Sequence, residues 1–186
     1  MKAIRKLLII FAVLASVPLH AQRWSISTNA VDWADLGTLN AEASYAFGRH
    51  FSVHAGARYN PWTYNPGNEN EQVQRRQRSF AAGLRYWPWH VYAGWWVSTK
   101  GQYQEYNRGG LQDRQTEEGD AYGGALSAGY SWMLSPHVNL EFGAGVWAGS
   151  TKYKVYACPV CGRIVDQGNK FFILPTDLSI SLVLVL

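Results

Sequence analysis

The sequence predicts a single all-β domain, an eight-stranded antiparallel up-and-down transmembrane β-barrel that occupies residues 22–186. Three observations lead to this fold class. Apolar and polar residues alternate with period two in eight segments. Short and long connections between these segments alternate along the chain. The rows that oppose the apolar rows carry mainly Gly, Ser and Asn, which suits the narrow interior of a small barrel.

Composition excludes several other classes. Of the 186 residues, 47% are hydrophobic and 15% are aromatic, which argues against a disordered chain. No segment after residue 21 contains about 18 consecutive apolar residues, so a bundle of membrane-spanning helices is excluded. The 2 cysteines are too few for a disulfide-rich scaffold. The 9 Trp and 11 Tyr exceed what a small soluble core uses, and aromatic girdles at a membrane interface would account for them.

The first 21 residues are typical of a cleaved secretory signal peptide. Lys2, Arg5 and Lys6 provide a basic start, an uncharged run follows over residues 7–17, and Ala21 is a small residue suited to signal peptidase. Three of the four net positive charges belong to this leader, so the mature chain is nearly neutral. A nucleic-acid partner is therefore not expected, and the predicted location is the outer membrane.

Each predicted strand has one apolar row and one polar row. In the last segment Ile180, Leu182 and Leu184 alternate with Ser179 and Ser181, which is the clearest case, whereas the first segment is the weakest. These segments approach the 9–11 residues that a tilted strand needs to cross a membrane. The predicted strands cover residues 24–30, 39–47, 51–60, 80–86, 91–98, 122–132, 138–146 and 177–186. Their apolar rows include, in chain order, Ala41, Val53, Leu84, Val97, Leu126, Leu140 and Leu182.

The connections favour a membrane barrel over a soluble one. Three are short, at 48–50, 88–90 and 135–137, and four are long and polar, at 32–37, 63–78, 102–120 and 151–172. Short periplasmic turns and long extracellular loops are typical of outer-membrane barrels. A soluble periplasmic lipocalin-like binder is the alternative, but it would place its apolar rows inside and would need a polar exterior.

Five ionisable residues fall on the polar rows and are expected to meet in the lumen. An eight-stranded barrel is just wide enough for its own side chains, so a paired, plugging network is expected there and a substrate pore is not. The predicted polar network of the lumen consists of Glu42, Arg58, Arg85, Lys100 and Glu141.

Cys158 and Cys161 form a C-x-x-C pair in the last long connection. Exported thiols at this spacing usually oxidise, so a small disulfide loop is the first interpretation. Unpaired thiols in a reducing habitat and a metal or redox role are the alternatives. A zinc site needs four ligands, and this motif supplies two. No cofactor and no metal site is predicted.

A lipid-modifying enzyme of the lipid A deacylase type is the alternative function. Such an enzyme places a His and a Ser two residues apart so that the base reaches the nucleophile, and His50 and Ser52 have this spacing. However, the topology puts them at a periplasmic turn, away from the outer leaflet. The chain is therefore expected to have no catalytic residues and to act as a non-enzymatic surface protein.

The polar connections supply the residues expected to meet partners. Arg75, Arg76 and Arg78 could contact lipopolysaccharide phosphates at the membrane rim. Four tyrosines are expected on the loops and available to a surface partner: Tyr64, Tyr103, Tyr106 and Tyr153.

Several motifs together resemble a domain-of-unknown-function family of small exported proteins from Bacteroidota. The segments are 59–63 (YNPWT), 125–140 (ALSAGYSWMLSPHVNL) and the late series CPxCG, GNK and PT. The resemblance implies an outer-membrane barrel and brings no catalytic residues. It also implies a link to surface assembly, because some relatives are encoded near fimbrial genes. Asp177 and Leu178 replace smaller residues of the family pattern, which makes the register of the last strand the least certain element.

Overall fold

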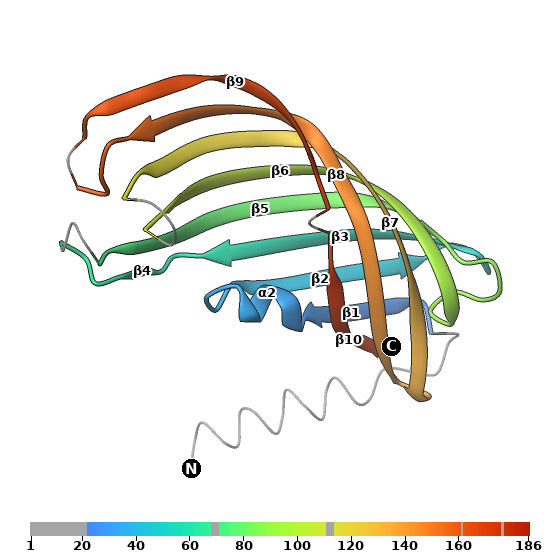
Figure 1. The fold of residues 1–186 in the computed structure, drawn as a ribbon. Helices are drawn as coiled ribbons and strands as arrows, with labels where there is room; N and C mark the ends of the chain where they lie inside the picture. Colours follow the sequence, from blue (N-terminus) through green and yellow to red (C-terminus); the bar gives the residue numbers. More distant parts are fainter. Residues whose placement is uncertain (1–21, 68–70, 111–113, 161, 176) are drawn as a thin grey trace, which may run out of the picture.

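A computed structural model describes residues 22–67, 71–110, 114–160, 162–175 and 177–186. The chain forms an antiparallel sheet whose strands follow one another in sequence order and close into a barrel. In Figure 1 the long strands β5 to β9 arch over the shorter β1, β2 and β10. The elements are β1 (Trp24–Asn29), α2 (Ala30–Ala34), β2 (Leu39–Ala46), β3 (Phe51–Asn60), β4 (Thr63–Tyr64), β5 (Val73–Tyr86), β6 (Gly94–Gly109), β7 (Thr116–Ser135), β8 (Val138–Tyr156), β9 (Ile164–Leu174) and β10 (Ser179–Val185).

The predicted eight-stranded antiparallel barrel is confirmed. Its strands are β1, β2, β3, β5, β6, β7, β8 and β10, and β10 closes the ring because it pairs with both β8 and β1. Ser25 lies opposite Val185, so the two ends of the described chain meet in the closing pair. Within the ring, closure leaves none of these eight strands with a free edge. It therefore removes the unpaired backbone groups through which a sheet can pair with other chains and aggregate.

The apolar rows face outward and the polar rows face the lumen. Leu126 is 69% exposed and Leu182 is 54% exposed, whereas Ser52 is fully buried and Ser131 is 2% exposed. This distribution is the reverse of a soluble barrel, in which apolar side chains fill the interior. Successive side chains of a strand point to opposite faces of the sheet. The alternation in the sequence is therefore sufficient to assign each residue to the lumen or to the exterior.

Three of the four long loops predicted from polarity are wrong. The described residues of 63–78, 102–120 and 151–172 lie mainly in strands, because β5 to β8 continue past β3 and β10. The last of these regions also contains most of β9. Beyond a barrel rim both faces of a sheet can be polar, so polar residues do not end a strand; turn residues such as Gly110 and Gly162, which adopt positive φ, do. We call β9 and the parts of β5 to β8 that extend past β3 and β10 the wall.

Two separate strands, β9 and β10, pair with successive parts of β8. β9 pairs with β8 from Trp147 to Tyr156, and β10 pairs with β8 from Val138 to Gly143. β10 alone reaches β1, so β9 belongs to the wall and β10 belongs to the ring. Pro175 follows β9 directly, and its missing N–H interrupts the ladder at this point.

The first connection folds back over one end of the barrel. Asn29 caps the short helix α2, since its Oδ1 accepts a hydrogen bond from the Val31 N–H at 3.1 Å. The helix ends in a turn in which Leu36 and Gly37 adopt positive φ. Among the described residues, no helix is long and apolar enough to cross a membrane.

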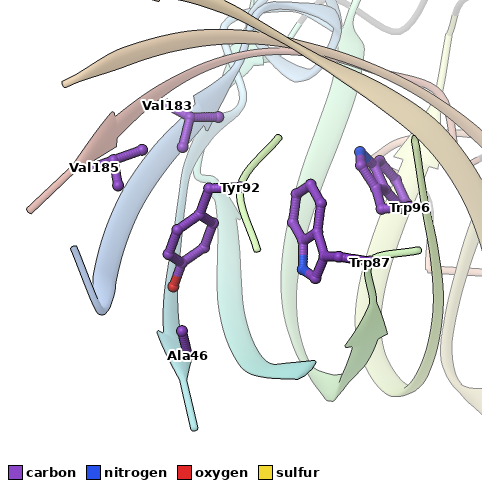
Figure 2. Packing of buried hydrophobic residues seen from close by; sticks show 6 residues of the cluster. All are labelled: Ala46, Trp87, Tyr92, Trp96, Val183 and Val185. Atoms are coloured by element: carbon purple, nitrogen blue, oxygen red, sulfur yellow. The ribbon is translucent and has the colours of Figure 1, made fainter. Parts of the chain in front are cut away.

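The opposite end of the barrel is sealed by aromatic side chains that we call the plug: Trp87, Tyr92 and Trp96. Figure 2 shows Trp87 between the other two rings, with Val183 and Val185 beside Tyr92. Trp87 is fully buried, and its ring centroid lies 5.8 Å from that of Tyr92 and 6.4 Å from that of Trp96. Aromatic pairs at such distances stabilise a core beyond the area they bury.

The plug required a longer connection than the sequence suggested. The tight turn predicted at 88–90 runs from Trp87 to Ala93, and β6 begins at Gly94 instead of residue 91. Tyr92 has a φ of 64°, which turns its ring into the barrel. Two hydrogen bonds hold its carbonyl, one from Asn139 at 2.6 Å and one from Ser131 at 3.2 Å.

We expect Trp87→Ala to destabilise the barrel by about 3–5 kcal/mol, because it removes a fully buried indole and its hydrogen bond to Ser52. Trp89→Ala is the matched control, since Trp89 is 78% exposed and its loss should change stability by less than about 0.5 kcal/mol. Urea unfolding followed by tryptophan fluorescence measures both. Equal stabilities for the two variants would contradict the role of the plug.

Candidate functional site

The lumen contains an ion cluster centred on Arg85. Its Nη1 lies 3.1 Å from Glu141 Oε2, and its Nη2 lies 3.0 Å from Glu42 Oε1. The Arg85 and Glu141 side chains are 9% and 5% exposed. His54 Nδ1 lies 3.2 Å from the second oxygen of Glu42. A buried guanidinium between two carboxylates is held by charge and by hydrogen bonds at once.

Arg85 also joins this cluster to the plug. Its guanidinium carbon lies 4.3 Å from the ring centroid of Trp96 and 5.6 Å from that of Trp87. The negative face of an indole attracts a cation at this distance. Gly129 and Gly143 make room for Trp96, because a Cβ on either residue would approach its ring closer than 3 Å. The layer of ions therefore rests directly on the layer of aromatic rings.

A second ion cluster lies nearer the wall and includes α2. Asp177 accepts a hydrogen bond from Lys100 Nζ at 2.6 Å and another from the Ser127 hydroxyl. Arg58 Nη2 lies 3.8 Å from Asp177, and Arg58 Nε lies 3.0 Å from Asp32. Asp32 comes from α2, so this cluster ties the first connection to the strands of the ring.

The structure brings all five sequence-predicted lumen residues together, in two groups. Glu42, Arg85 and Glu141 form one group, while Arg58 and Lys100 belong to the other. Sequence reasoning missed the partners Asp32, His54 and Asp177. His54 and Asp177 did carry a signal, because both lie on the polar row of a predicted strand. Asp32 carried none, since its helix was expected to be an irregular loop.

Little space remains between these side chains. The lumen holds a cavity of about 80 Å³ whose lining includes Glu42, His54, Arg58, Lys100 and Asp177. This volume accommodates a few water molecules and no larger solute. The plug fills one end of the lumen and ion pairs fill the rest, so the lumen serves as the structural core of the barrel.

A much larger groove lies along the wall. Its volume is about 820 Å³, and residues from β3 and from each of β5 to β9 line it. The lining mixes four basic side chains with three acidic ones, so neither sign of charge dominates. The charged lining residues are Arg76, Arg78, Lys152, Lys154, Glu105, Glu118 and Asp120. Such a surface suits a polar or mixed macromolecular partner better than a single anionic ligand.

A continuous chain of contacts crosses the wall from β6 to β9. The Tyr106 hydroxyl donates to Glu117 Oε1 at 2.7 Å, and Lys170 Nζ donates to the same oxygen at 3.0 Å. Lys170 also lies 4.4 Å from the ring centroid of Tyr153, whose hydroxyl donates to Asp166 at 3.1 Å. Four strands are thereby fixed relative to one another outside the closed ring.

These contacts shift two pKa values in opposite directions. Partial burial, together with the hydrogen bond to Glu117, raises the pKa of Tyr106 to about 12, although the nearby Thr151 and Arg108 act against the rise. Partial burial would raise the pKa of Glu117, but the hydrogen bonds from Tyr106 and Lys170 and the charge of Arg108 outweigh it, so this pKa is lowered. The carboxylate and the neutral phenol are the stable pair.

The predicted loop residues lie elsewhere than expected. Tyr64 is on β4, Tyr103 and Tyr106 are on β6, and Tyr153 is on β8, so the four tyrosines are strand residues and not loop residues. Among the rim arginines, Arg75 is engaged by Asp35 at 2.9 Å. Arg78 lies 3.8 Å from Glu105, and both side chains are largely exposed. A contact between these arginines and lipopolysaccharide stays a prediction.

His50 and Ser52 do not form a base and nucleophile pair. Ser52 is fully buried, and its hydroxyl accepts a hydrogen bond from Trp87 Nε1 at 3.1 Å. His50 Nδ1 lies 2.9 Å from the carbonyl oxygen of the same Trp87. Both polar groups therefore support the plug.

The cysteine prediction is only partly covered by the structure. Cys161 lies outside the described residues, so its disulfide with Cys158 stays a prediction. In the part of the chain that is described, no group of three or more His, Cys, Asp or Glu side chains is arranged to hold a metal ion.

The fold and the lumen define a class: a closed antiparallel β-barrel with an apolar exterior and a lumen filled by ion pairs. Within this class, the chain belongs to the family described as "Protein of unknown function (DUF3575)", whose model matches residues 7–186. The expected membership of a domain-of-unknown-function family is thereby confirmed. Comparisons with curated proteins and with solved structures give no match.

Arg85→Met should cost about 3–5 kcal/mol of stability, because it leaves the buried Glu141 and the half-buried Glu42 without their cation. The triple variant Arg85→Met, Glu42→Gln, Glu141→Gln should recover most of this loss, since it removes all three charges. Arg78→Met, on an exposed side chain, is the control. Urea midpoints compare the four proteins, and an Arg85→Met protein as stable as the control would show that the ion cluster is dispensable.

The Tyr106 phenol should titrate near pH 12, about two pH units above an ordinary tyrosine. Since the folded pKa lies above the unfolded value, the stability linked to Tyr106 is fully present below pH 10 and is lost as the pH rises toward 12. NMR of tyrosines labelled with ¹³C at Cζ follows this titration. Glu117→Gln should move it toward pH 10, whereas Glu105→Gln should leave it unchanged.

Proposed function

We propose that this protein is an outer-membrane β-barrel, exported by a signal peptide over residues 1–21, that presents the wall to a surface partner. The single observation that carries the proposal is the apolar exterior of a closed barrel. Phe80, Leu84, Leu126, Ile180 and Leu182 are all at least 44% exposed on this surface. In water such a continuous apolar belt would drive aggregation, whereas lipid tails solvate it.

Aromatic residues near the plug end support a membrane interface there. Three cross-strand pairs lie on the outer face at this end of the barrel. Their centroid distances are 4.7 Å for Trp24 and Tyr45, 5.2 Å for Phe51 and Tyr86, and 5.3 Å for Trp95 and Tyr130. Amphipathic rings collect at the level of lipid headgroups. In this orientation the plug end faces the periplasm and the wall projects from the cell surface.

The filled lumen argues against transport. A solute would have to displace Arg85 from two carboxylates and then pass Trp87 and Trp96, which are buried. A soluble lipocalin-like role is disfavoured by the same geometry, because this lumen offers ions and not an apolar cavity to a ligand. For a lipid-modifying enzyme, the two residues considered are engaged with Trp87, so no observation favours that alternative.

The wall is the part left to act. Its strands are longer than a membrane requires, and β7 and β8 comprise 20 and 19 residues. It carries the groove, with Arg76 and Arg78 in its lining, within reach of lipopolysaccharide phosphates at the rim. We infer a structural role in surface adhesion or assembly, in a bacterium of the Bacteroidota, with a fimbrial or other surface protein as the partner.

Cell fractionation combined with labelling tests the location and the orientation. Folded protein should be extracted from the outer membrane by detergent and should migrate faster on gels before boiling than after. In a background of Cys158→Ser and Cys161→Ser, an impermeant maleimide should label Gln115→Cys on intact cells and should spare Trp89→Cys until the cells are lysed. Folded protein that stays soluble without detergent would refute the proposal. The reverse labelling pattern would show that the barrel has the opposite orientation in the membrane.

A deletion strain tests the enzymatic alternative separately. We expect the mass of lipid A to be unchanged by deletion. A lipid A mass that changes on deletion, and that only a gene with intact His50 and Ser52 restores, would make the protein a lipid-modifying enzyme.

A further inference from the structure

One edge of the wall is an unpaired strand. β9 pairs with β8 from Ile164 to Leu174, apart from the bulged Val165, and no backbone hydrogen bond on its other side is found among the described residues. In an antiparallel sheet roughly half of the N–H and C=O groups of an edge strand point away from its neighbour. Every residue of this 11-residue strand is exposed except Phe172, which is half-buried.

The opposite edge of the wall is protected. There β4 pairs with the start of β5, at Thr63 with Gln74 and at Tyr64 with Val73. Asp35, from the first connection, holds Arg75 on the same strand. The contrast between the two edges shows that the fold covers one of them and leaves β9 open.

Beyond a bulge at Val165, near its start, β9 lacks the features by which proteins usually protect an edge. Such edges are short, bulged, interrupted by Pro, or guarded by an outward lysine. Ile164–Leu174 contains no Pro, and its single lysine, Lys170, points to Glu117 and Tyr153. On the other face Phe171 and Ile173 are 68% and 64% exposed. This strand combines free backbone groups with an apolar row, as acceptor strands do in strand addition.

We propose that β9 accepts an extended segment of another protein, which adds to the sheet as an antiparallel strand beside it. The side chains of β9 define the chemistry of that segment. Its outer row must be apolar to lie beside Phe171 and Ile173. The row of the segment on the other face, the face of Asp166 and Lys170, must carry a basic residue opposite Asp166. The Asp166 carboxylate accepts a hydrogen bond from Tyr153 but lies in no ion pair of the described residues. The proposal rests on the surface role proposed above and names the mode of binding.

A second copy of this chain fits the edge less well. Two copies in one membrane are related by an axis along the membrane normal. With strands tilted by about 35–45° from that normal, their β9 strands would cross at about 70–90°, which no hydrogen-bonded ladder allows. A flexible segment of a different protein is free to align with β9 along its length.

A peptide of defined design tests the proposal. The probe is a fluorescent 11-residue peptide, matching β9 in length, in which valine alternates with threonine and one threonine, opposite Asp166, is replaced by arginine. The folded barrel in detergent should bind it saturably. It should bind a peptide with glutamate at that position about fivefold more weakly. A peptide N-methylated at alternate residues should not bind, because its backbone donors are removed.

Variants of the protein locate the binding. Asp166→Lys should reverse the preference between the arginine and glutamate peptides, whereas Asp120→Lys, on an exposed acid of β7, should preserve it. Heat-modifiable migration confirms that each variant is folded. Unchanged preference in Asp166→Lys, or equal binding of the N-methylated peptide, would overturn the proposal. A dimer that Asp166→Lys dissociates would overturn it as well, by assigning the edge to a second copy.

The outcome is independent of the test of location. The peptide experiment uses purified protein, so binding would stand even if fractionation showed that the protein is not in the outer membrane. Conversely, an outer-membrane protein that ignores the peptide would retain the proposed location and lose this mode of binding.

Discussion

The guanidinium of Arg85 is the group on which the rest of the barrel depends. It is bound by Glu42 on β2 and Glu141 on β8 and rests on the Trp96 ring from β6. A lumen of this width must be filled by side chains, and polar rows leave only polar groups to fill it. The pairing therefore holds together strands that are distant across the ring, and it supplies the interior cohesion that apolar packing provides in a soluble protein.

The aromatic plug and the second ion cluster extend this arrangement in both directions. Below Arg85, Trp87 and Tyr92 close the barrel with the only large apolar cluster at that end of the described structure. Above it, Asp177 and Arg58 connect the ring to α2. The wall lies outside this core and is fixed by its own contacts, such as those of Glu117. The molecule therefore has a rigid, filled base and a separately stabilised surface for recognition.

The ring could be predicted from the sequence because its physics is visible in the residue order. An apolar row next to lipid or solvent and a small polar row inside give a strict alternation, as in Ile180, Leu182 and Leu184 against Ser179 and Ser181. The five lumen charges could be found in the same way. The wall could not, because Gln104, Tyr106 and Arg108 share one face of β6 with no apolar row to mark the strand. Asp32 and Tyr92 owe their positions to a helix cap and a positive φ, which the alternation does not encode.

The closure of the ring has a consequence for the order of assembly. β1 has β2 as its neighbour on one side, and its other side is filled only by β10, so Trp24–Asn29 stays an open edge until nearly the whole chain is present. Contacts of such long sequence separation form slowly. A partly made chain must therefore be kept apart from other chains by some means outside its own fold until β10 pairs with β1 and closes the barrel.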